Sequence, residues 1–267
     1  MPYIRICHSS LAGGPAKIHL RDYGSGIPLV FLHGGWGYEI YPIEPHSSAR
    51  QGFRVLIPDR TGYGRSTKPA IFGADLHRRA LQETVQLLDA LQLERCIFWG
   101  HSDGAVIAAW LGLTVPQRCL GLVLEAFHYD REKPRSRAFF QAMASDPDSF
   151  GVRLTEILKR EHGEPYWREL IRSEGQAWLD IASSAAGINK DLFDGRLSQL
   201  RVPAVFIHGA DDPRTEPWEL AAVHGEVPAA PMRVIKGGGH SPHSESASAA
   251  EFNRVLGDAL AQWRRVT

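Results

Sequence analysis

The sequence is poor in cysteine, has no excess of either charge, and lacks any long apolar run. Its 267 residues include three cysteines, and so few at irregular spacing argue against a disulfide framework. Lys plus Arg and Asp plus Glu total 30 each, so the charge does not predict capture of nucleic acid or of an acidic membrane. No run reaches the ~18 apolar residues of a membrane span, and the first residues lack a signal-peptide pattern. We therefore expect a cytoplasmic protein with a small-molecule partner, and neither nucleic acid nor membrane.

Short apolar runs alternate with longer amphipathic ones, which is typical of a mostly parallel sheet flanked by helices. The length suits one compact domain with a large core. Expected strands cover residues 4–7, 17–21, 29–32, 54–57, 96–99, 121–124, 204–207 and 232–235. Expected helices cover residues 76–91, 103–114 and 247–265. The fold class predicted is therefore α/β, with an eight-stranded sheet.

The region from residue 127 to residue 196 interrupts this alternation. It has helical stretches with scattered aromatic residues and no clear strand. We interpret it as a helical cap inserted into a core formed by residues 1–126 and 197–267. Two ordinary peripheral helices with long loops are the alternative interpretation.

The strongest local signal is Gly100-His101-Ser102-Asp103-Gly104, between an apolar run and a helical one. A serine hydroxyl is a weak nucleophile unless it is exposed beside a base. A sharp strand-to-helix turn exposes it but crowds the residues two before and two after, which favours glycine at both places. The pattern predicts Ser102 as a nucleophile, although an ordinary glycine-flanked turn would also fit.

A second motif, His33-Gly34-Gly35-Trp36, follows the apolar run 29–32. Acyl transfer needs backbone N–H groups that stabilise an oxyanion. We expect those donors to be the amides of Gly35 and of Asp103, the residue after the predicted nucleophile. Four residues near strand ends are expected to line the substrate pocket: Trp36, Phe127, His128 and Tyr129.

The candidate base is His240, which follows the last expected strand and three glycines. Histidine is suited to proton transfer near neutral pH, and His243 is the nearest rival. The two histidines could suggest a metal pair, but no further ligands occur at metal spacing, so we expect no metal and no cofactor. For the acid that orients the base we favour Asp212, then Glu125, then Asp211.

Taken in order, these motifs resemble the α/β-hydrolase fold family over residues 18–263, including the turn Asp59-x-x-Gly62-x-Gly64-x-Ser66. The resemblance implies Ser102 as nucleophile, His240 as base, Asp212 as acid and the amides of Gly35 and Asp103 as oxyanion hole. It also implies a cap between the sixth and seventh strands. Two features depart from the commonest pattern. The spacing from Asp212 to Pro217 is one residue longer than usual, and position 102 is not the aspartate of haloalkane dehalogenases and epoxide hydrolases.

The predicted activity is a serine hydrolase that cleaves a small-to-medium, largely apolar ester, thioester, lactone or amide through an acyl-enzyme. A carbon–carbon bond hydrolase or lyase on the same fold is the first alternative, because fold does not fix function. A ligand-binding protein without turnover is the second. The sequence does not indicate an oligomeric state.

Overall fold

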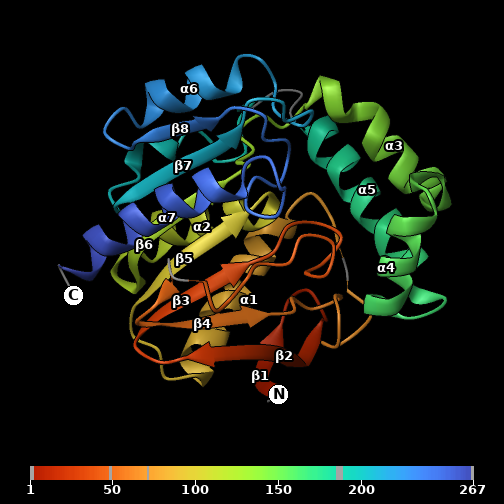
Figure 1. Cartoon of the computed structure of the whole chain (residues 1–267). Coiled ribbons are helices and arrows are strands. Elements are labelled where there is room, and N and C mark those ends of the chain that lie inside the picture. The colour runs from red at the N-terminus through yellow and green to blue at the C-terminus, as the bar shows by residue number, and fades with distance from the viewer. Residues whose placement is uncertain (1–2, 48–49, 71, 185–188, 266–267) are drawn as a thin grey trace.

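The computed structural model describes residues 3–47, 50–70, 72–184 and 189–265, and it contains one eight-stranded sheet (Figure 1). The strands are β1 (Tyr3–Ser9), β2 (Gly14–Gly24), β3 (Ile27–Leu32), β4 (Phe53–Pro58), β5 (Cys96–His101), β6 (Cys119–Glu125), β7 (Ala204–Gly209) and β8 (Met232–Ile235). Their spatial order is β1-β2-β4-β3-β5-β6-β7-β8. β2 pairs antiparallel with β1 and β4, and every later pairing is parallel. All eight expected strands are confirmed.

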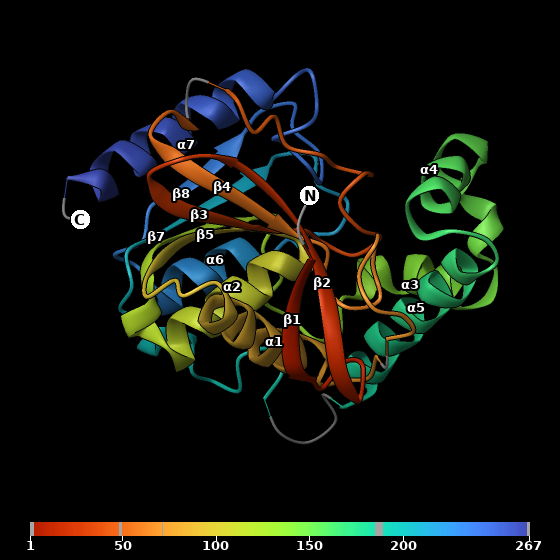
Figure 2. The ribbon, with the colours of Figure 1, turned by 90° about the horizontal axis from the view of Figure 1, so that it is seen from below.

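Helices cover both faces of the sheet. Helices α1 (Leu76–Ala90), α2 (Asp103–Thr114) and α6 (Glu219–Glu226) lie on one face, and α7 (Ala249–Arg264) lies on the other (Figure 2). The three expected helices are confirmed to within two residues at either end. The sequence analysis did not predict α6, which has only eight residues and a weak apolar pattern.

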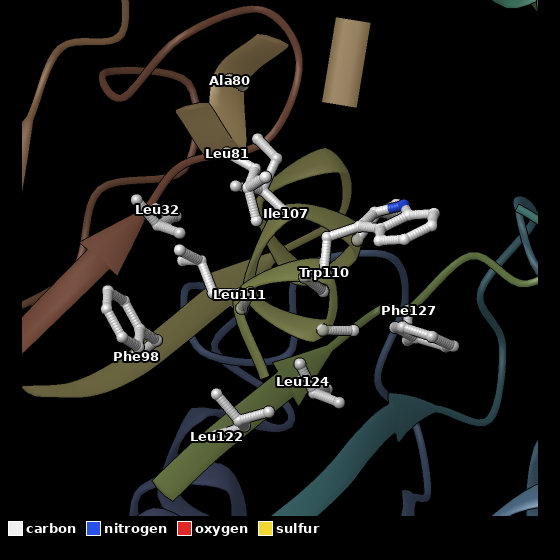
Figure 3. Close-up of a cluster of buried hydrophobic side chains, with 14 of the residues drawn as sticks. Leu32, Ala80, Leu81, Phe98, Ile107, Trp110, Leu111, Leu122, Leu124 and Phe127 are labelled. Carbon is white, nitrogen blue, oxygen red and sulfur yellow. The ribbon is translucent and has the colours of Figure 1, made fainter. Parts of the chain in front are cut away.

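Each face of the sheet has its own apolar core. Figure 3 shows Ile107 and Leu111 of α2 between Leu81 of α1 and the strands. α2 is almost entirely buried, so it fixes the helix N-terminus against the end of β5. On the other face Phe252 of α7 stacks on Trp99, with ring centroids 5.2 Å apart. Cys96 and Cys119 are buried free thiols, as expected, and Cys7 is exposed.

Helices α3 (Arg137–Ser145), α4 (Val152–His162) and α5 (Tyr166–Ser184) form a separate group beyond the carboxyl ends of the strands (Figures 1 and 2). A β-bridge between Asp130 and Asp191 joins the two ends of this insertion. The described residues also include short 3₁₀ turns at Pro116–Arg118, Pro134–Ser136, Pro147–Phe150 and Leu197–Gln199. In the described ranges no helix has the length and apolarity needed to cross a membrane.

Candidate active site

Ser102 occupies a strained turn between β5 and α2, with φ 55° and ψ −120°. A left-handed conformation of this kind is costly for a residue with a side chain, and such strain is concentrated at functional sites. A Cβ on Gly100 would collide with the backbone of Gly104, and a Cβ on Gly104 would collide with the carbonyl of Leu32. The crowding that predicted glycine at both positions is therefore present.

Three side chains from distant parts of the sequence meet at this turn. His240, on the loop after β8, has Nε2 3.0 Å from the Ser102 Oγ. Its Nδ1 lies 3.0 Å from both carboxylate oxygens of Asp212, on the loop after β7. Asp212 also accepts hydrogen bonds from the Arg214 amide and the Thr215 hydroxyl. The spacing suits proton transfer from Ser102 to His240 while Asp212 fixes the tautomer of the imidazole.

The Asp212 carboxylate is held in its charged form. Burial alone would raise its pKa, but the charge of His240 and its hydrogen bond, with the Arg214 amide, outweigh burial and hold the pKa well below its usual range. A permanently charged partner stabilises the imidazolium that forms when His240 takes a proton.

The two alternative acids lie elsewhere. Asp211 is exposed, and its amide donates to the carbonyl of Gly238. Glu125 is fully buried at the end of β6 and accepts from His243 through both the ring Nδ1, at 2.8 Å, and the backbone amide, at 3.0 Å. Trp99 Nε1 donates to its other oxygen at 2.9 Å. The structure thus pairs the Glu125 side chain with the rival histidine, His243, while its backbone carbonyl accepts from the Ser102 amide at 2.9 Å.

This Glu125–His243 pair anchors the loop that carries His240. His243 Nε2 lies 3.0 Å from the carbonyl of Tyr41, which fixes both sides of the ring. Burial lowers the pKa of His101 to about 3, and its Nε2 lies 3.0 Å from the His240 carbonyl. We call the loop of residues 237–245 the base loop, and the core holds it at His240 and at His243.

Gly35 and Asp103, the residues of the expected oxyanion donors, lie close together beside Ser102. A Cβ on Gly34 would approach the Ser102 Cβ to 2.9 Å, and one on Gly35 would approach the Asp103 carboxylate to 3.1 Å. In the described part of the chain, neither the Gly35 amide nor the Asp103 amide donates to a protein acceptor. The Asp103 carboxylate is occupied by His77 Nε2 at 2.9 Å.

We call residues 34–39 the oxyanion loop. Two glutamates of the helical insertion accept hydrogen bonds from its last residues, 36–39. Glu174 of α5 accepts from the Trp36 amide at 3.1 Å, and its other oxygen accepts from the Tyr63 hydroxyl. Glu161 of α4 accepts from the amides of Tyr38 and Glu39 at 2.8 and 3.0 Å. The insertion therefore shapes the loop expected to stabilise the oxyanion.

Both glutamates are buried, and among the described residues neither forms an ion pair with a Lys or Arg. The ring of His162 lies 3.7 Å from Glu161. Burial raises the pKa of Glu161 to about 8, against the opposing hydrogen bonds from the two amides. Burial, and then the negative charge of Asp103, raises the pKa of Glu174 to about 7. The neighbouring His162, whose pKa burial lowers to about 4, donates from Nε2 to the Trp36 carbonyl at 2.8 Å.

Glu161, His162 and Glu174 were not expected from the sequence. One signal was available for Glu174: it lies among apolar residues at helical spacing on α5, where the buried face continues with Leu170, Ile171, Ala177 and Trp178. A carboxylate on such a face needs a hydrogen-bonding partner. Nothing local identifies that partner, because the Trp36 amide is 138 residues away.

A cavity of ≈ 190 Å³ opens above Ser102 and His240. Its walls combine the oxyanion loop, Tyr41, the insertion and the loop after β7: Gly35, Trp36, Tyr41, Phe139, Phe140, Met143, Trp178, Pro213 and Arg214. Among the expected pocket residues, Trp36 and His128 line it. Phe127 and Tyr129 do not, which corrects that expectation. Phe127 stacks on Phe193 at 5.2 Å, and Tyr129 packs against the core, because successive side chains of an extended segment point to opposite sides.

The described residues contain no cluster of three or more His, Cys, Asp or Glu side chains arranged to hold a metal ion. The site is instead built from a serine, a histidine and a carboxylate at the carboxyl edge of a parallel sheet, where such sheets place their ligands.

The fold and this arrangement define an α/β hydrolase. The sequence matches the alpha/beta hydrolase family over residues 29–255, and the chain belongs to that family. It is 26% identical to the 2-hydroxymuconate semialdehyde hydrolase of Pseudomonas sp. (strain CF600), covering 92% of this chain and 91% of that one. It is 29% identical to the 2-hydroxy-6-oxononadienedioate/2-hydroxy-6-oxononatrienedioate hydrolase of Paraburkholderia xenovorans (strain LB400), covering 93% and 92%. A carboxylesterase structure from Nitrososphaera gargenis superposes over 100% of both chains with a TM-score of 0.73 at 19% identity.

Proposed function

We propose that the chain is a serine hydrolase that cleaves a small-to-medium, largely apolar carboxylic ester, thioester, lactone or amide through an acyl-enzyme. One observation carries the proposal: the Ser102 Oγ lies 3.0 Å from His240 Nε2, and the Nδ1 of the same ring lies on Asp212. A cavity with walls of Trp36, Phe139 and Phe140 opens directly above, which suits an apolar acyl or leaving group.

Each step of the proposed acyl transfer is assigned to an atom of the site. His240 Nε2 takes the hydroxyl proton as Oγ attacks the carbonyl carbon, and the amides of Gly35 and Asp103 receive the negative oxygen. The Asp103 amide is the first of α2, so the positive end of the helix dipole adds to this stabilisation. The imidazolium then gives its proton to the leaving group, and water releases the acid by the same route.

The test is a Ser102→Ala variant measured against a series of p-nitrophenyl esters of rising acyl length. We expect kcat to fall by at least ~10³-fold, with an unchanged melting temperature. A fluorophosphonate probe should label the wild type and not the variant. A variant that keeps full turnover would exclude the serine mechanism, and wild-type binding without turnover would favour a ligand-binding protein.

A second candidate is hydrolysis of a carbon–carbon bond in a vinylogous diketone acid. Two observations favour it: relatives named as hydroxymuconate and oxo-dienedioate hydrolases match over more than 90% of the chain, and Arg214 gives the cavity wall a cation that would suit a carboxylate. Turnover of such a substrate at a rate above that of any ester, with loss of the preference in Arg214→Leu, would establish this alternative.

A further inference from the structure

Two imidazole rings, rather than one, reach the hydroxyl of Ser102. His240 Nε2 lies 3.0 Å from Oγ, and His128 Nε2 lies 3.1 Å from the same oxygen. The triad described above uses only the first of these rings. His128 is buried in the cavity wall, 3% exposed, so its contact with the nucleophile is shielded from water.

Contacts from both the core and the insertion hold His128 in this place. The chain leaves β6 through Ala126, whose φ of 48° is unusual for a residue with a side chain, and whose amide donates to the Ile207 carbonyl at 3.0 Å. The His128 ring then stacks on the His240 ring at 5.7 Å and meets Trp178 of α5 edge to face at 5.3 Å. Core and insertion together orient the imidazole toward Ser102.

The hydrogen-bond partners around Ser102 point to one tautomer of His128. In the proposed triad a neutral His240 donates through Nδ1 to Asp212, so its Nε2 accepts the one proton of the Ser102 hydroxyl. The second ring must then donate to Oγ through an Nε2–H. In agreement, His128 Nδ1 is buried with no partner among the described residues, and a bare lone pair is easier to leave unpaired than an N–H donor. Burial lowers the pKa of His128 well below its usual value, which leaves the ring neutral.

We propose that His128 is a second catalytic histidine, which donates a hydrogen bond to Oγ in the resting enzyme and to the leaving-group oxygen during acyl transfer. This inference rests on the proposed ester cleavage. When the Oγ–carbon bond forms, Oγ becomes an ester oxygen and a weaker acceptor. When the bond from carbon to the leaving oxygen breaks, that oxygen takes the electron pair. His240 supplies its proton, and His128 keeps its own and contributes only the hydrogen bond.

A hydrogen bond from His128 to the leaving oxygen should make the importance of His128 depend on the leaving group of the ester. A leaving alkoxide concentrates negative charge on one oxygen and gains most from a hydrogen-bond donor. A leaving p-nitrophenolate spreads its charge over the ring and gains little. His128 should therefore matter for alkyl esters much more than for p-nitrophenyl esters of the same acid.

The test compares wild type, His128→Leu and His128→Gln on ethyl butyrate and p-nitrophenyl butyrate. Gln places an amide N–H near the position of Nε2 without adding a titrating group, and Leu fills the space without a donor. We expect His128→Leu to lose about tenfold in kcat/KM on the ethyl ester and no more than about twofold on the p-nitrophenyl ester. His128→Gln should recover most of the loss. Equal losses on both esters, or no recovery with Gln, would show a structural role only.

A second measurement does not depend on turnover. Long-range ¹⁵N–¹H correlation spectra of the wild type, with His128 assigned by its absence in His128→Gln, should show a neutral Nε2–H tautomer from pH 5 to pH 8. An Nδ1–H tautomer or a protonated ring in that range would overturn the inference. If the wild type cleaves neither ester, or Ser102→Ala stays active, the proposed function itself fails, and the spectra still decide the hydrogen bond.

Discussion

The base loop and the oxyanion loop lie on two sides of Ser102, and the protein holds them by different chemistry. On the base side, Glu125 and Asp212 each face a histidine, and both carboxyl pKa values are lowered. On the oxyanion side, Glu161 and Glu174 accept hydrogen bonds from backbone amides and a tyrosine, and their pKa values are raised. A histidine can share charge with a carboxylate that burial would otherwise neutralise, whereas amides and a phenol compensate only in part.

The glutamates that hold the two loops also come from different parts of the chain. Glu125 comes from β6 of the core, so the base loop is fixed by the sheet itself. Glu161 and Glu174 come from α4 and α5 of the insertion. The proton-transfer half of the site is therefore expected to survive changes in the insertion, while the oxyanion half depends on it. The following changes separate the two halves, beginning with the largest expected effect.

The first prediction concerns Asp212→Asn. The Arg214 amide donates to Oδ1 and cannot accept, so the asparagine oxygen would take that position. The NH₂ would replace Oδ2, where it faces His240 Nδ1 at 3.0 Å and where the Thr215 hydroxyl can accept from it. His240 would then carry its proton on Nε2 and could not accept one from Ser102. We expect kcat to fall by about 10³–10⁴-fold, measured with a p-nitrophenyl ester.

Asp211→Asn is the matched control, because Asp211 is the adjacent, exposed aspartate. It should keep kcat within about twofold. If the control lost activity and Asp212→Asn kept it, the acid would be Asp211. Asp212 would then not orient the base, and the base side in the comparison of the two loops would have to be described with another carboxylate.

The second prediction concerns Glu125→Gln. Three N–H groups converge on the two Glu125 oxygens, and a glutamine would present a donor to one of them. Removing one partner from such a buried set should cost about 3 kcal/mol in the free energy of unfolding, measured by urea denaturation. We expect kcat to fall by only about tenfold. The Glu125 carbonyl accepts from the Ser102 amide at 2.9 Å and is unchanged in this variant, and the side-chain partners of Glu125 are Trp99 and His243 rather than Ser102 or His240.

The two variants together distinguish an acid from an anchor. Asp212→Asn should mainly change kcat, whereas Glu125→Gln should mainly change stability. A Glu125→Gln variant that lost activity as completely as Asp212→Asn while remaining stable would make Glu125 part of the proton transfer.

The base side was predictable from sequence, and the oxyanion side only in part. Ser102 and His240 carry their signals locally, since glycines flank Ser102 and precede His240, and each follows an expected strand. The glycines after the run 29–32 likewise indicated a loop at the same edge of the sheet, and its oxyanion role stays a prediction. The glutamates that hold the oxyanion loop have backbone amides as partners, and any residue offers an amide. Pairing Glu161 with Tyr38 across 123 residues requires the folded insertion.

The contact of His128 with Ser102 was likewise not predictable from the sequence. Its position after β6 indicated a pocket residue, and it lines the cavity. Its contact with Ser102 depends on the left-handed turn at Ala126. An alanine in the sequence does not indicate such a turn. Phe127 and Tyr129 were assigned to the pocket by proximity in sequence, but adjacent side chains of an extended segment diverge.

The third prediction concerns how stability changes with pH, which should differ in sign between Glu161 on the oxyanion side and Glu125 on the base side. Glu161 has a pKa of about 8 in the native state, raised by burial, against about 4.3 in an unfolded chain. Between these values the native protein keeps a proton that the unfolded chain has lost, so the free energy of unfolding falls as pH rises from 5 to 8. Glu125, with its lowered pKa, acts in the opposite direction: its contribution is present above the unfolded pKa and is lost as pH falls through the native one.

Glu161→Gln removes the first of these titrations and leaves the second. We expect the stability of the wild type relative to Glu161→Gln to decline by roughly 1–3 kcal/mol between pH 5 and pH 8.5, measured by urea denaturation at each pH. Glu156→Gln is the matched control, because Glu156 lies exposed on the same helix and should give a curve parallel to the wild type. If Glu161→Gln also ran parallel, Glu161 would be ionised throughout this range, the two amides would compensate its charge as fully as His243 compensates Glu125, and the two loops would be held by equivalent means.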